Sequence, residues 1–560
     1  SGGQSYALYS TDTQNRYTVG VYDPDRAEDV VFVGGIVAAI VDKTYSDIAA
    51  AVEAAGDNDM ITLLTSVNGL TVIAGKNITL DLNGFNVTAA AAGEYAVTVE
   101  SGALLIIVGD GDVSGYNGES GYSYQNNGTL ELRGGTYTQT LDFAVVGDDC
   151  SVAITDNGAF TVSEEAAVAT ITRDAITYNF ANVQSAFRFA QNNDTIVLQQ
   201  DASAGGIQFN VGEDETIVFD LNGHDVSANS VFFNMLSGTL SIVNGDTQGS
   251  TMTTKQRAFQ IMPNIGCTAT LQLGENITVR AGGDNAVFMQ TNYDSDYVKT
   301  NGTENLPLES VLISSADIIA TNGVAIQGNG TMHGTRIVIN GGSVVSETSH
   351  AIYHPQYGEL IIENADVKGW VTGVEIRAGV LEVRNSTIIG SGSFSAEANG
   401  DGTTVSGAAV AVSQHTTDLP VSVTIEEGSV LRGEKALYEE DLQNSTVTDI
   451  ELSVTGGSFE GEVYSQNVSA FIAGGSFDTD LTDTYLTEGY VQDDESGEII
   501  TEEEANAVAM IETADGIVYY DTLQAAINAA DSGATVTLLK DLPESVTVAE
   551  GQEIVLDLNG

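Results

Sequence analysis

Two histidines near the middle of the chain are the first candidates for chemistry. His350 and His354 are four residues apart, a spacing that can bind a metal ion only when both rings lie on one face. On a strand or a turn this spacing does not guarantee a common face. We therefore expect no metal site at this pair.

Three arginines in the same part of the chain are the candidates for catalysis. A polysaccharide lyase needs an arginine or lysine base beside a calcium-binding acidic cluster, and a hydrolase needs two or three carboxylates on one face. The arginines are Arg336, Arg377 and Arg384, and acids about one repeat away are Glu359, Glu363 and Asp366. No Asp-rich motif adjoins the arginines, so the sequence favours their neutralising an acidic face. We assign no catalytic residue.

A polar stretch rich in tyrosine is the best candidate for a binding contact. In residues 115–126, Tyr116, Tyr122 and Tyr124 alternate with glycine and amide residues. Exposed aromatic rings stack on sugars and amides bind sugar hydroxyls, so these tyrosines are predicted to contact a glycan or another partner. The alternative is an insertion loop packed on the side of the fold. Trp370, the only tryptophan, is expected to fill a corner.

Short acidic pairs are the candidates for calcium, the one cofactor that the sequence leaves open. Asp57 and Asp59, and likewise Asp110 and Asp112, could bind Ca²⁺ together with backbone carbonyls. Neither pair has the full spacing of a known calcium loop, so plain turns are favoured.

A passage that occurs three times shows which elements position these residues. It ends in Leu/Phe-Asp-Leu-Asn-Gly at 80–84, 219–223 and 556–560. Upstream, apolar residues at i, i+3, i+4 and i+7 predict one face of a short helix. These residues are Ile48, Ala51, Val52 and Ala55; Val183, Ala186, Phe187 and Ala190; and Leu523, Ala526, Ile527 and Ala530. We interpret the passage as a cap or joint, with Asp81, Asp220 and Asp557 as outward turn or ladder residues.

Between these passages the chain consists of short apolar strands that end in glycine or asparagine. Equivalent positions Ile339, Ile362 and Val383 are 23 and 21 residues apart. In the segments 452–459 and 471–477, the equivalent residues Phe459 and Phe477 are 18 apart. A period of about 20 residues is typical of one coil of a parallel β-helix. A stack of β-sandwich domains is the alternative, but recurring Gly-Gly-Ser/Thr-aromatic corners and the preceding helix favour the β-helix.

These motifs resemble pectate-lyase-like β-helix repeats in large, adhesin-like surface proteins of anaerobic gut bacteria. The resemblance covers Tyr45 to Gly84, Tyr178 to Gly223 and Tyr520 to Gly560, together with Gly474 to Tyr490. It implies an extracellular or cell-wall-associated protein and no defined activity, since fold does not fix function.

The expected fold is all-β: a right-handed parallel β-helix, or solenoid, in tandem modules that each begin with a short amphipathic capping helix. Residues 1–40 are an N-terminal β segment or the end of a preceding module. The first module is 41–175, the second is 176–500, and a third, incomplete module begins at 501–560. Because the third copy stops at Gly560, we expect a segment of a longer polypeptide.

Composition restricts the partners. The chain has 78 acidic and 18 basic residues and a formal charge of −60, which excludes nucleic acid. Apolar residues make up 42% of the chain, which is enough for a large core. We therefore interpret the acidic residues as a solvated outer surface. Adaptation to high salt would explain the same composition. Cys150 and Cys267 give no disulfide framework. No apolar run of about 18 residues occurs, so no membrane insertion is expected within the segment.

The function expected from these patterns is a structural or adhesive protein at the cell surface, built as a stiff acidic rod, stalk or filament. Its expected partners are further copies joined end to end, or a host or cell-surface glycan. The alternative is a carbohydrate-active enzyme or a glycan-binding module on the same scaffold. An even acidic surface would favour the first, and a groove with clustered acids and arginines the second.

Overall fold

Strands dominate the computed structural model, which describes residues 6–10, 17–21, 36–443, 449–543 and 545–559. Most of the predicted segment 1–40 lies outside the described residues, apart from two short paired strands, β1 (Tyr6–Ser10) and β2 (Tyr17–Val21), and residues 36–40. Contacts divide the chain into unit 1, Ser1–Ala204 with Ile217–His224, and unit 2, Gly205–Thr216 with Asp225–Gly560. The predicted module boundaries stay predictions.

Each repeated passage folds into the same small motif of hairpin, helix and strand. The hairpins are β3 (Ala38–Ile40) with β4 (Lys43–Tyr45), β18 (Ala169–Arg173) with β19 (Ile176–Phe180), and β53 (Ala509–Thr513) with β54 (Gly516–Tyr520). The helices are α1 (Ile48–Ala54), α2 (Val183–Phe189) and α5 (Leu523–Ala529), and the strands that follow are β5 (Asp59–Leu63), β20 (Thr195–Leu198) and β55 (Thr535–Leu538). Each following strand pairs antiparallel with the first hairpin strand. We call each such motif an opening, because it begins a predicted module. The predicted helices are confirmed, but the sheets at the openings are mixed rather than purely parallel.

The repeated Asp-Leu-Asn-Gly sequence makes the same tight turn in every copy. The carboxylates of Asp81, Asp220 and Asp557 accept the N–H of the asparagine two residues later, at 2.9, 2.9 and 3.0 Å. Those asparagines, Asn83, Asn222 and Asn559, have φ of 48°, 48° and 50°, a left-handed conformation that asparagine tolerates. The prediction that these aspartates are turn residues is confirmed.

In unit 1 the first opening leads into short parallel ladders. One joins β5 to β8 (Asn77–Asp81), β11 (Leu104–Val108) and β14 (Thr129–Leu132). A second joins β6 (Val67–Asn68), β9 (Val87–Thr88), β12 (Asp112–Ser114) and β15 (Thr136–Tyr137). A third, which we call the groove ladder, joins β7 (Leu70–Val72), β10 (Val97–Val99) and β13 (Tyr124–Asn126). Two further strands, β16 (Ser151–Ile154) and β17 (Phe160–Ser163), pair antiparallel.

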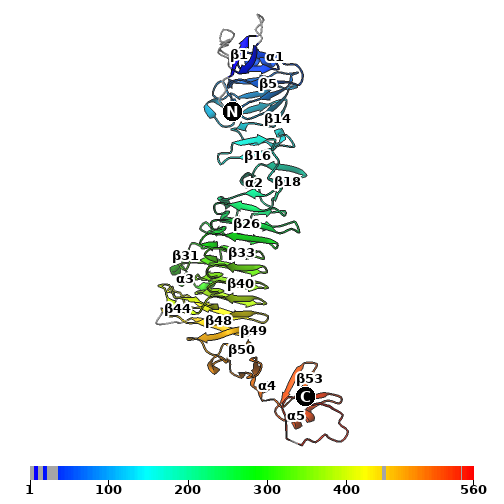
Figure 1. The fold of residues 1–560 in the computed structure, drawn as a ribbon, viewed down its shortest axis with the longest axis vertical. Helices are drawn as coiled ribbons and strands as arrows, with labels where there is room; N and C mark the ends of the chain where they lie inside the picture. Colours follow the sequence, from blue (N-terminus) through cyan, green and yellow to red (C-terminus); the bar gives the residue numbers. More distant parts are fainter. Residues whose placement is uncertain (1–5, 11–16, 22–35, 444–448, 544, 560) are drawn as a thin grey trace. The chain divides into compact units, whose positions relative to one another are not determined.

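Unit 2 contains three longer parallel ladders, A, B and C, in which consecutive strands join different ladders, a solenoid-like pattern (Figure 1). Ladder A joins β25 (Phe233–Val243), β28 (Ala269–Leu273), β32 (Ser310–Ser314), β36 (Thr335–Asn340), β39 (Gly358–Glu363), β42 (Gly379–Arg384), β47 (Val421–Ile425) and β49 (Ile450–Ser465). Ladder B joins β24 (Val226–Ala228), β26 (Ser250–Thr254), β29 (Ile277–Ala281), β33 (Asp317–Ala320), β37 (Ser343–Ser346), β40 (Asp366–Gly369), β43 (Thr387–Gly390) and β48 (Val430–Glu439). Ladder C joins β22 (Ile207–Asn210), β25, β27 (Phe259–Ile261), β30 (Asn285–Met289), β34 (Val324–Gly328), β38 (Ile352–His354), β41 (Val374–Ile376), β46 (Ala408–Val412) and β48.

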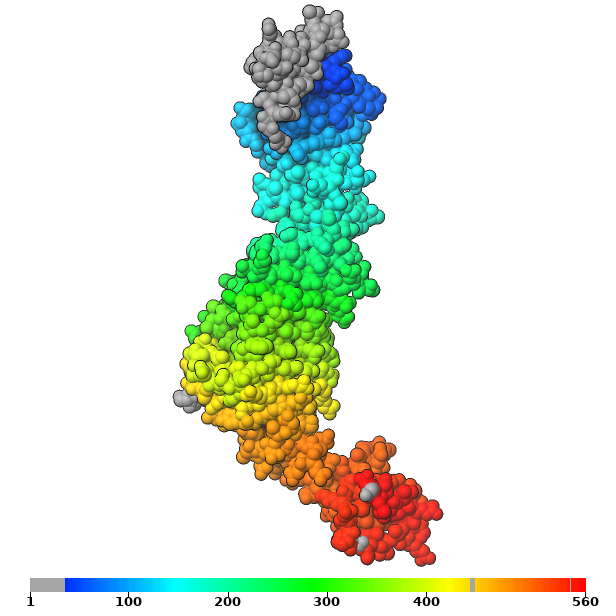
Figure 2. Space-filling view, in the orientation of Figure 1, coloured from blue at the N-terminus to red at the C-terminus, as the bar shows by residue number. Residues whose placement is uncertain are grey.

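The core of unit 2 consists of columns of aliphatic side chains that stack from strand to strand. In ladder A, Leu240, Leu271, Leu312, Ile337, Leu360, Leu381, Val423 and Leu452 are successive register partners, and all are buried. The predicted equivalence of Ile339, Ile362 and Val383 is confirmed, because the three are in register. In the space-filling view the colours of unit 2 change in bands, since each turn of the chain lies against the one before it (Figure 2).

Two insertions interrupt the ladders of unit 2. The first contains β31 (Tyr293–Asp294), α3 (Ser295–Asn301) and η4 (Thr303–Asn305), and the second is the hairpin of β44 (Ser395–Ala398) and β45 (Thr403–Ser406). After ladder A the chain continues through β50 (Ile472–Phe477), β51 (Tyr490–Gln492), β52 (Ile499–Thr501) and α4 (Glu502–Asn506) to the third opening. Among the described residues, no helix is long and apolar enough to cross a membrane.

Candidate functional site

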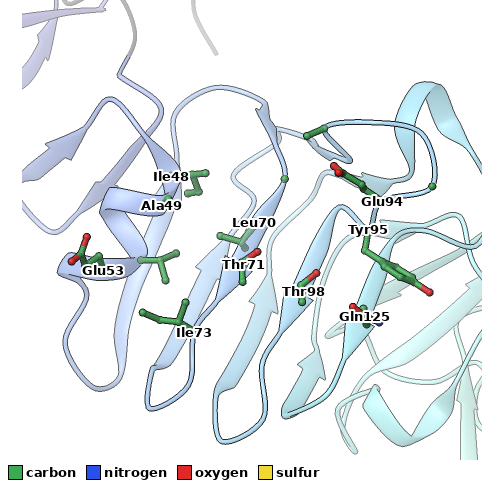
Figure 3. Close-up of a pocket in the computed structure, with 14 residues that line it drawn as sticks. Ile48, Ala49, Glu53, Leu70, Thr71, Ile73, Glu94, Tyr95, Thr98 and Gln125 are labelled. Carbon is green, nitrogen blue, oxygen red and sulfur yellow. The ribbon is translucent and has the colours of Figure 1, made fainter.

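A groove with a volume of about 840 Å³ lies over the groove ladder of unit 1. Its floor is the outward column of this ladder, Thr71, Thr98 and Gln125, which are register partners on β7, β10 and β13. Side chains alternate between the two faces of a strand, so these three point outward while their neighbours point into the core. Figure 3 shows the three side chains on successive strands.

Helix α1 forms one wall of the groove through Ile48, Ala49, Val52 and Glu53. The helix is fixed at both ends. At its start, the Asp47 carboxylate accepts the N–H of Ala49. At its end, the Lys76 ammonium donates to the carbonyl oxygens of Glu53 and Ala55 at 2.6 and 2.7 Å, which satisfies groups that a helix end leaves unpaired.

The other side of the groove carries the aromatic ring of Tyr95, next to Glu94 (Figure 3). The Tyr95 ring packs against Tyr122 with 5.3 Å between ring centroids and an angle of 53°. Both rings are partly exposed. The pair therefore places an aromatic surface beside the hydroxyl and amide groups of the floor.

The groove presents hydrogen-bonding groups, one aromatic surface and negative charge. Glu53 and Glu94 are exposed, and none of its described lining residues is Lys or Arg. Ile73 adds an apolar contact, 42% exposed. A few convergent polar groups beside apolar surface are typical of a binding site for a small molecule or chain, and a cavity of this size is in the usual range.

The structure separates the three tyrosines that the sequence singled out. Tyr122 reaches the groove through Tyr95, and Tyr116 is 42% exposed but does not line it. Tyr124 is only 7% exposed, because register places it in the inward column with Leu70 and Val97. Its ring packs edge-on against Tyr137 in the core, and burial raises the pKa of Tyr124 to about 12. The expectation of an exposed ring at Tyr124 is therefore corrected.

Sequence reasoning missed Tyr95 and the floor of the groove. Thr71, Thr98 and Gln125 recur every 27 residues, one turn of the chain in this part of unit 1. That recurrence was the available signal, but polar residues at this spacing become meaningful only once the register is known. Trp370 is also corrected, since it is 63% exposed rather than filling a corner.

The three candidate arginines of unit 2 have different environments. Arg336 pairs with Glu359 at 3.4 Å and Arg384 with Glu382 at 3.2 Å, both on partly exposed surface, as expected of charges that neutralise an acidic face. Arg377 does not follow that expectation. It is 1% exposed and pairs at 2.6 Å with Glu375, which is equally buried and was not predicted.

Glu375 lies on β41 of ladder C, and Arg377 directly follows this strand and contacts the β44–β45 hairpin. The Arg377 guanidinium donates to the Thr403 carbonyl at 2.9 Å and to Asn399 at 3.3 Å, and both residues belong to the inserted segment. Burial alone would raise the pKa of Glu375, but the hydrogen bonds and charges of His350 and Arg377 outweigh it and hold that pKa below its ordinary value. In this arrangement the pair clamps the hairpin onto the ladder.

The structure gives His350 and His354 different partners. His350 Nε2 lies 2.8 Å from the Glu375 carboxylate, whereas the His354 ring is buried and its Nδ1 lies 3.2 Å from the Ala378 carbonyl oxygen. No group of three or more His, Cys, Asp or Glu side chains that could bind a metal ion occurs among the residues that the structure describes. Both cysteines are free thiols.

Of the acids considered for calcium, Asp59 takes part in a local turn and Asp112 begins strand β12. The Asp59 carboxylate accepts the Gly56 N–H at 2.7 Å, and the Asp112 N–H donates to Asn86 at 2.9 Å. The same turn recurs in the second opening, where Asp194 accepts the N–H of Gln191. The carboxylates of Asp59 and Asp194 therefore serve equivalent turns, and calcium binding at the acidic pairs stays a prediction.

In comparisons with known proteins, no family model, no curated protein and no solved structure matches this chain.

Proposed function

We propose that this chain is part of an extracellular structural and adhesive surface protein, built as a right-handed parallel β-helix of the pectate-lyase-like kind. The observation that carries the proposal is the set of ladders A, B and C, whose strands pair in parallel from one turn of the chain to the next as far as β48 and β49. Such a stack is stabilised by backbone hydrogen bonds between every pair of turns and by aliphatic columns along its core. It can lengthen by adding turns, as a stalk or filament requires.

Adhesion and self-association are the two activities that this scaffold would serve. The acidic composition keeps a β-rich surface soluble, and a strand edge that is left unpaired at the end of a stack would offer backbone groups to a further copy.

Electron microscopy of negatively stained purified protein, with sedimentation velocity at several concentrations, tests self-association. Fibres or end-to-end chains that grow with concentration are expected. Antibodies raised against the purified chain should label intact, unpermeabilised cells of the source. Monomers at all concentrations would exclude the filament, and labelling only after permeabilisation would exclude the surface location.

A carbohydrate-active enzyme is the second candidate, and the charged set of Glu375, Arg377 and His350 at ladder C is what favours it. Here Glu375 and Arg377 are each 1% exposed, so a substrate could reach them only after the β44–β45 hairpin moved away. An activity screen on neutral and acidic polysaccharides with the wild type and Glu375→Gln tests this candidate. Depolymerisation that disappears in the variant would support it over a purely structural role.

A further inference from the structure

We infer that the groove over β7, β10 and β13 binds an uncharged or amine-bearing glycan chain that runs across the strands, and that it discriminates against acidic glycans. The inference rests on the proposed adhesive function and names its ligand class. It assigns the contacts to Thr71, Thr98, Gln125 and Tyr95, on the described part of unit 1.

The dimensions of the floor suit a linear chain of sugars. Neighbouring strands of a sheet lie about 4.8 Å apart, which is comparable to the length of one sugar unit. Because Thr71, Thr98 and Gln125 are in register, one polar side chain recurs at each step across the ladder. A chain lying across the strands would meet one of these side chains per sugar.

The contacts available are those that a sugar uses. Each of the two threonine hydroxyls, and likewise the Gln125 amide, can donate a hydrogen bond to a sugar hydroxyl and accept one from it. None of the three is fully buried, so their groups face the groove rather than the core. Tyr95, braced by Tyr122, offers a ring face for the apolar face of a sugar, and Ile73 extends this apolar surface.

Charge defines which glycans fit. Glu53 and Glu94 lie on opposite walls of the groove (Figure 3). Lys76 is engaged by the carbonyl oxygens at the end of α1 and does not line the groove. The chain as a whole carries a formal net charge of −60. A uronate or sulfated chain would be repelled, whereas a neutral chain is accepted and an amino sugar is attracted.

Isothermal titration of the full chain with defined hexasaccharides tests the inference. The probes are cellohexaose, mannohexaose and xylohexaose as neutral chains, the chitosan hexamer as an amine-bearing chain, and the galacturonate hexamer as an acidic one. We expect at least one neutral or amine-bearing hexamer to bind and the galacturonate hexamer not to bind. Tyr95→Ala should weaken binding about tenfold and Thr98→Val about fivefold, from the loss of a ring contact and a hydrogen bond.

Matched controls lie close by. Thr79→Val removes a hydroxyl from β8 in the neighbouring ladder, and Tyr116→Ala removes an exposed ring that does not line the groove, so neither should change affinity. Binding of none of the neutral and amine-bearing hexamers, stronger binding of the galacturonate hexamer, or equal effects of groove and control variants would each overturn the inference. Any of these results would leave the microscopy and cell-labelling results standing, so the two proposals can fail separately.

Discussion

At the scale of single residues, His333 links the first insertion of unit 2 to pH. Its Nδ1 accepts the N–H of Tyr357 at 3.0 Å, and its Nε2 lies 2.8 Å from the Ser295 hydroxyl at the start of α3. The ring is fully buried, and burial, with the nearby His415 and His354, lowers the pKa of His333 to about 4, although Asp294 opposes this shift. The folded state therefore excludes a proton that the unfolded state accepts below about 6.5.

The α3 insertion should accordingly loosen as the pH falls from about 6.5 to 4. Between pH 6.5 and 4, the form in which the α3 insertion is detached binds more protons than the form in which it is packed. The free energy of detaching the insertion therefore decreases as the pH falls, by at most about 3 kcal/mol for a pKa shift of this size. Hydrogen exchange of residues 295–305, corrected for intrinsic rates, measures it. His333→Asn, which keeps an acceptor but does not titrate, should flatten the pH dependence. His224→Asn, at a partly exposed histidine of unit 1, should leave it unchanged; equal effects would contradict the assignment.

Asn83 is the second residue whose role can be measured. It holds a φ of 48° and its side-chain amide donates to the Leu63 carbonyl at 2.9 Å. Asn83→Ala should destabilise the β5–β8 region by about 1–3 kcal/mol, because alanine loses the hydrogen bond and tolerates a left-handed backbone poorly. Asn83→Gly should recover the backbone part. Hydrogen exchange of β5 and β8 peptides provides the measurement, and an alanine variant as stable as the glycine variant would rule out the backbone contribution.

At the scale of elements, strand β39 allows inward and outward side chains to be compared within one strand. Leu360 is fully buried in the column between Ile337 and Leu381, whereas its neighbour Ile361 points outward and is partly exposed. Leu360→Ala should destabilise unit 2 by about 2–5 kcal/mol through lost burial and a residual cavity. Ile361→Ala should cost clearly less. Scanning calorimetry of the full chain measures both, and similar losses would mean that the column does not carry the stability of the stack.

The elements also show how far the sequence could predict the structure. Helices α1, α2 and α5 and the register of Ile339, Ile362 and Val383 were predictable, because apolar periodicity reports directly which side faces the core. The hairpins before the helices were not. The β18–β19 turn places Asp174 and Ala175 at φ of 49° and 65°, a conformation usually signalled by Asn-Gly. The burial of Tyr124 depends on strand register. The burial of Glu375 and Arg377 depends on the β44–β45 insertion that covers them. Neither cause leaves a local pattern in the sequence.

At the scale of the whole molecule, charge repulsion is the property to test. The 18 basic residues cannot neutralise 78 acidic ones, even though some bind several acids, as Arg133 does with Glu131, Asp149 and Glu164. Raising NaCl from about 0.01 to 1 M shortens the screening length from about 30 to 3 Å, so the thermal midpoints of both units should rise. KCl should act equally. If screening alone acts, CaCl₂ at matched ionic strength should stabilise no more than NaCl. Stabilisation by micromolar Ca²⁺ would instead reveal a specific site and contradict the explanation by screening alone.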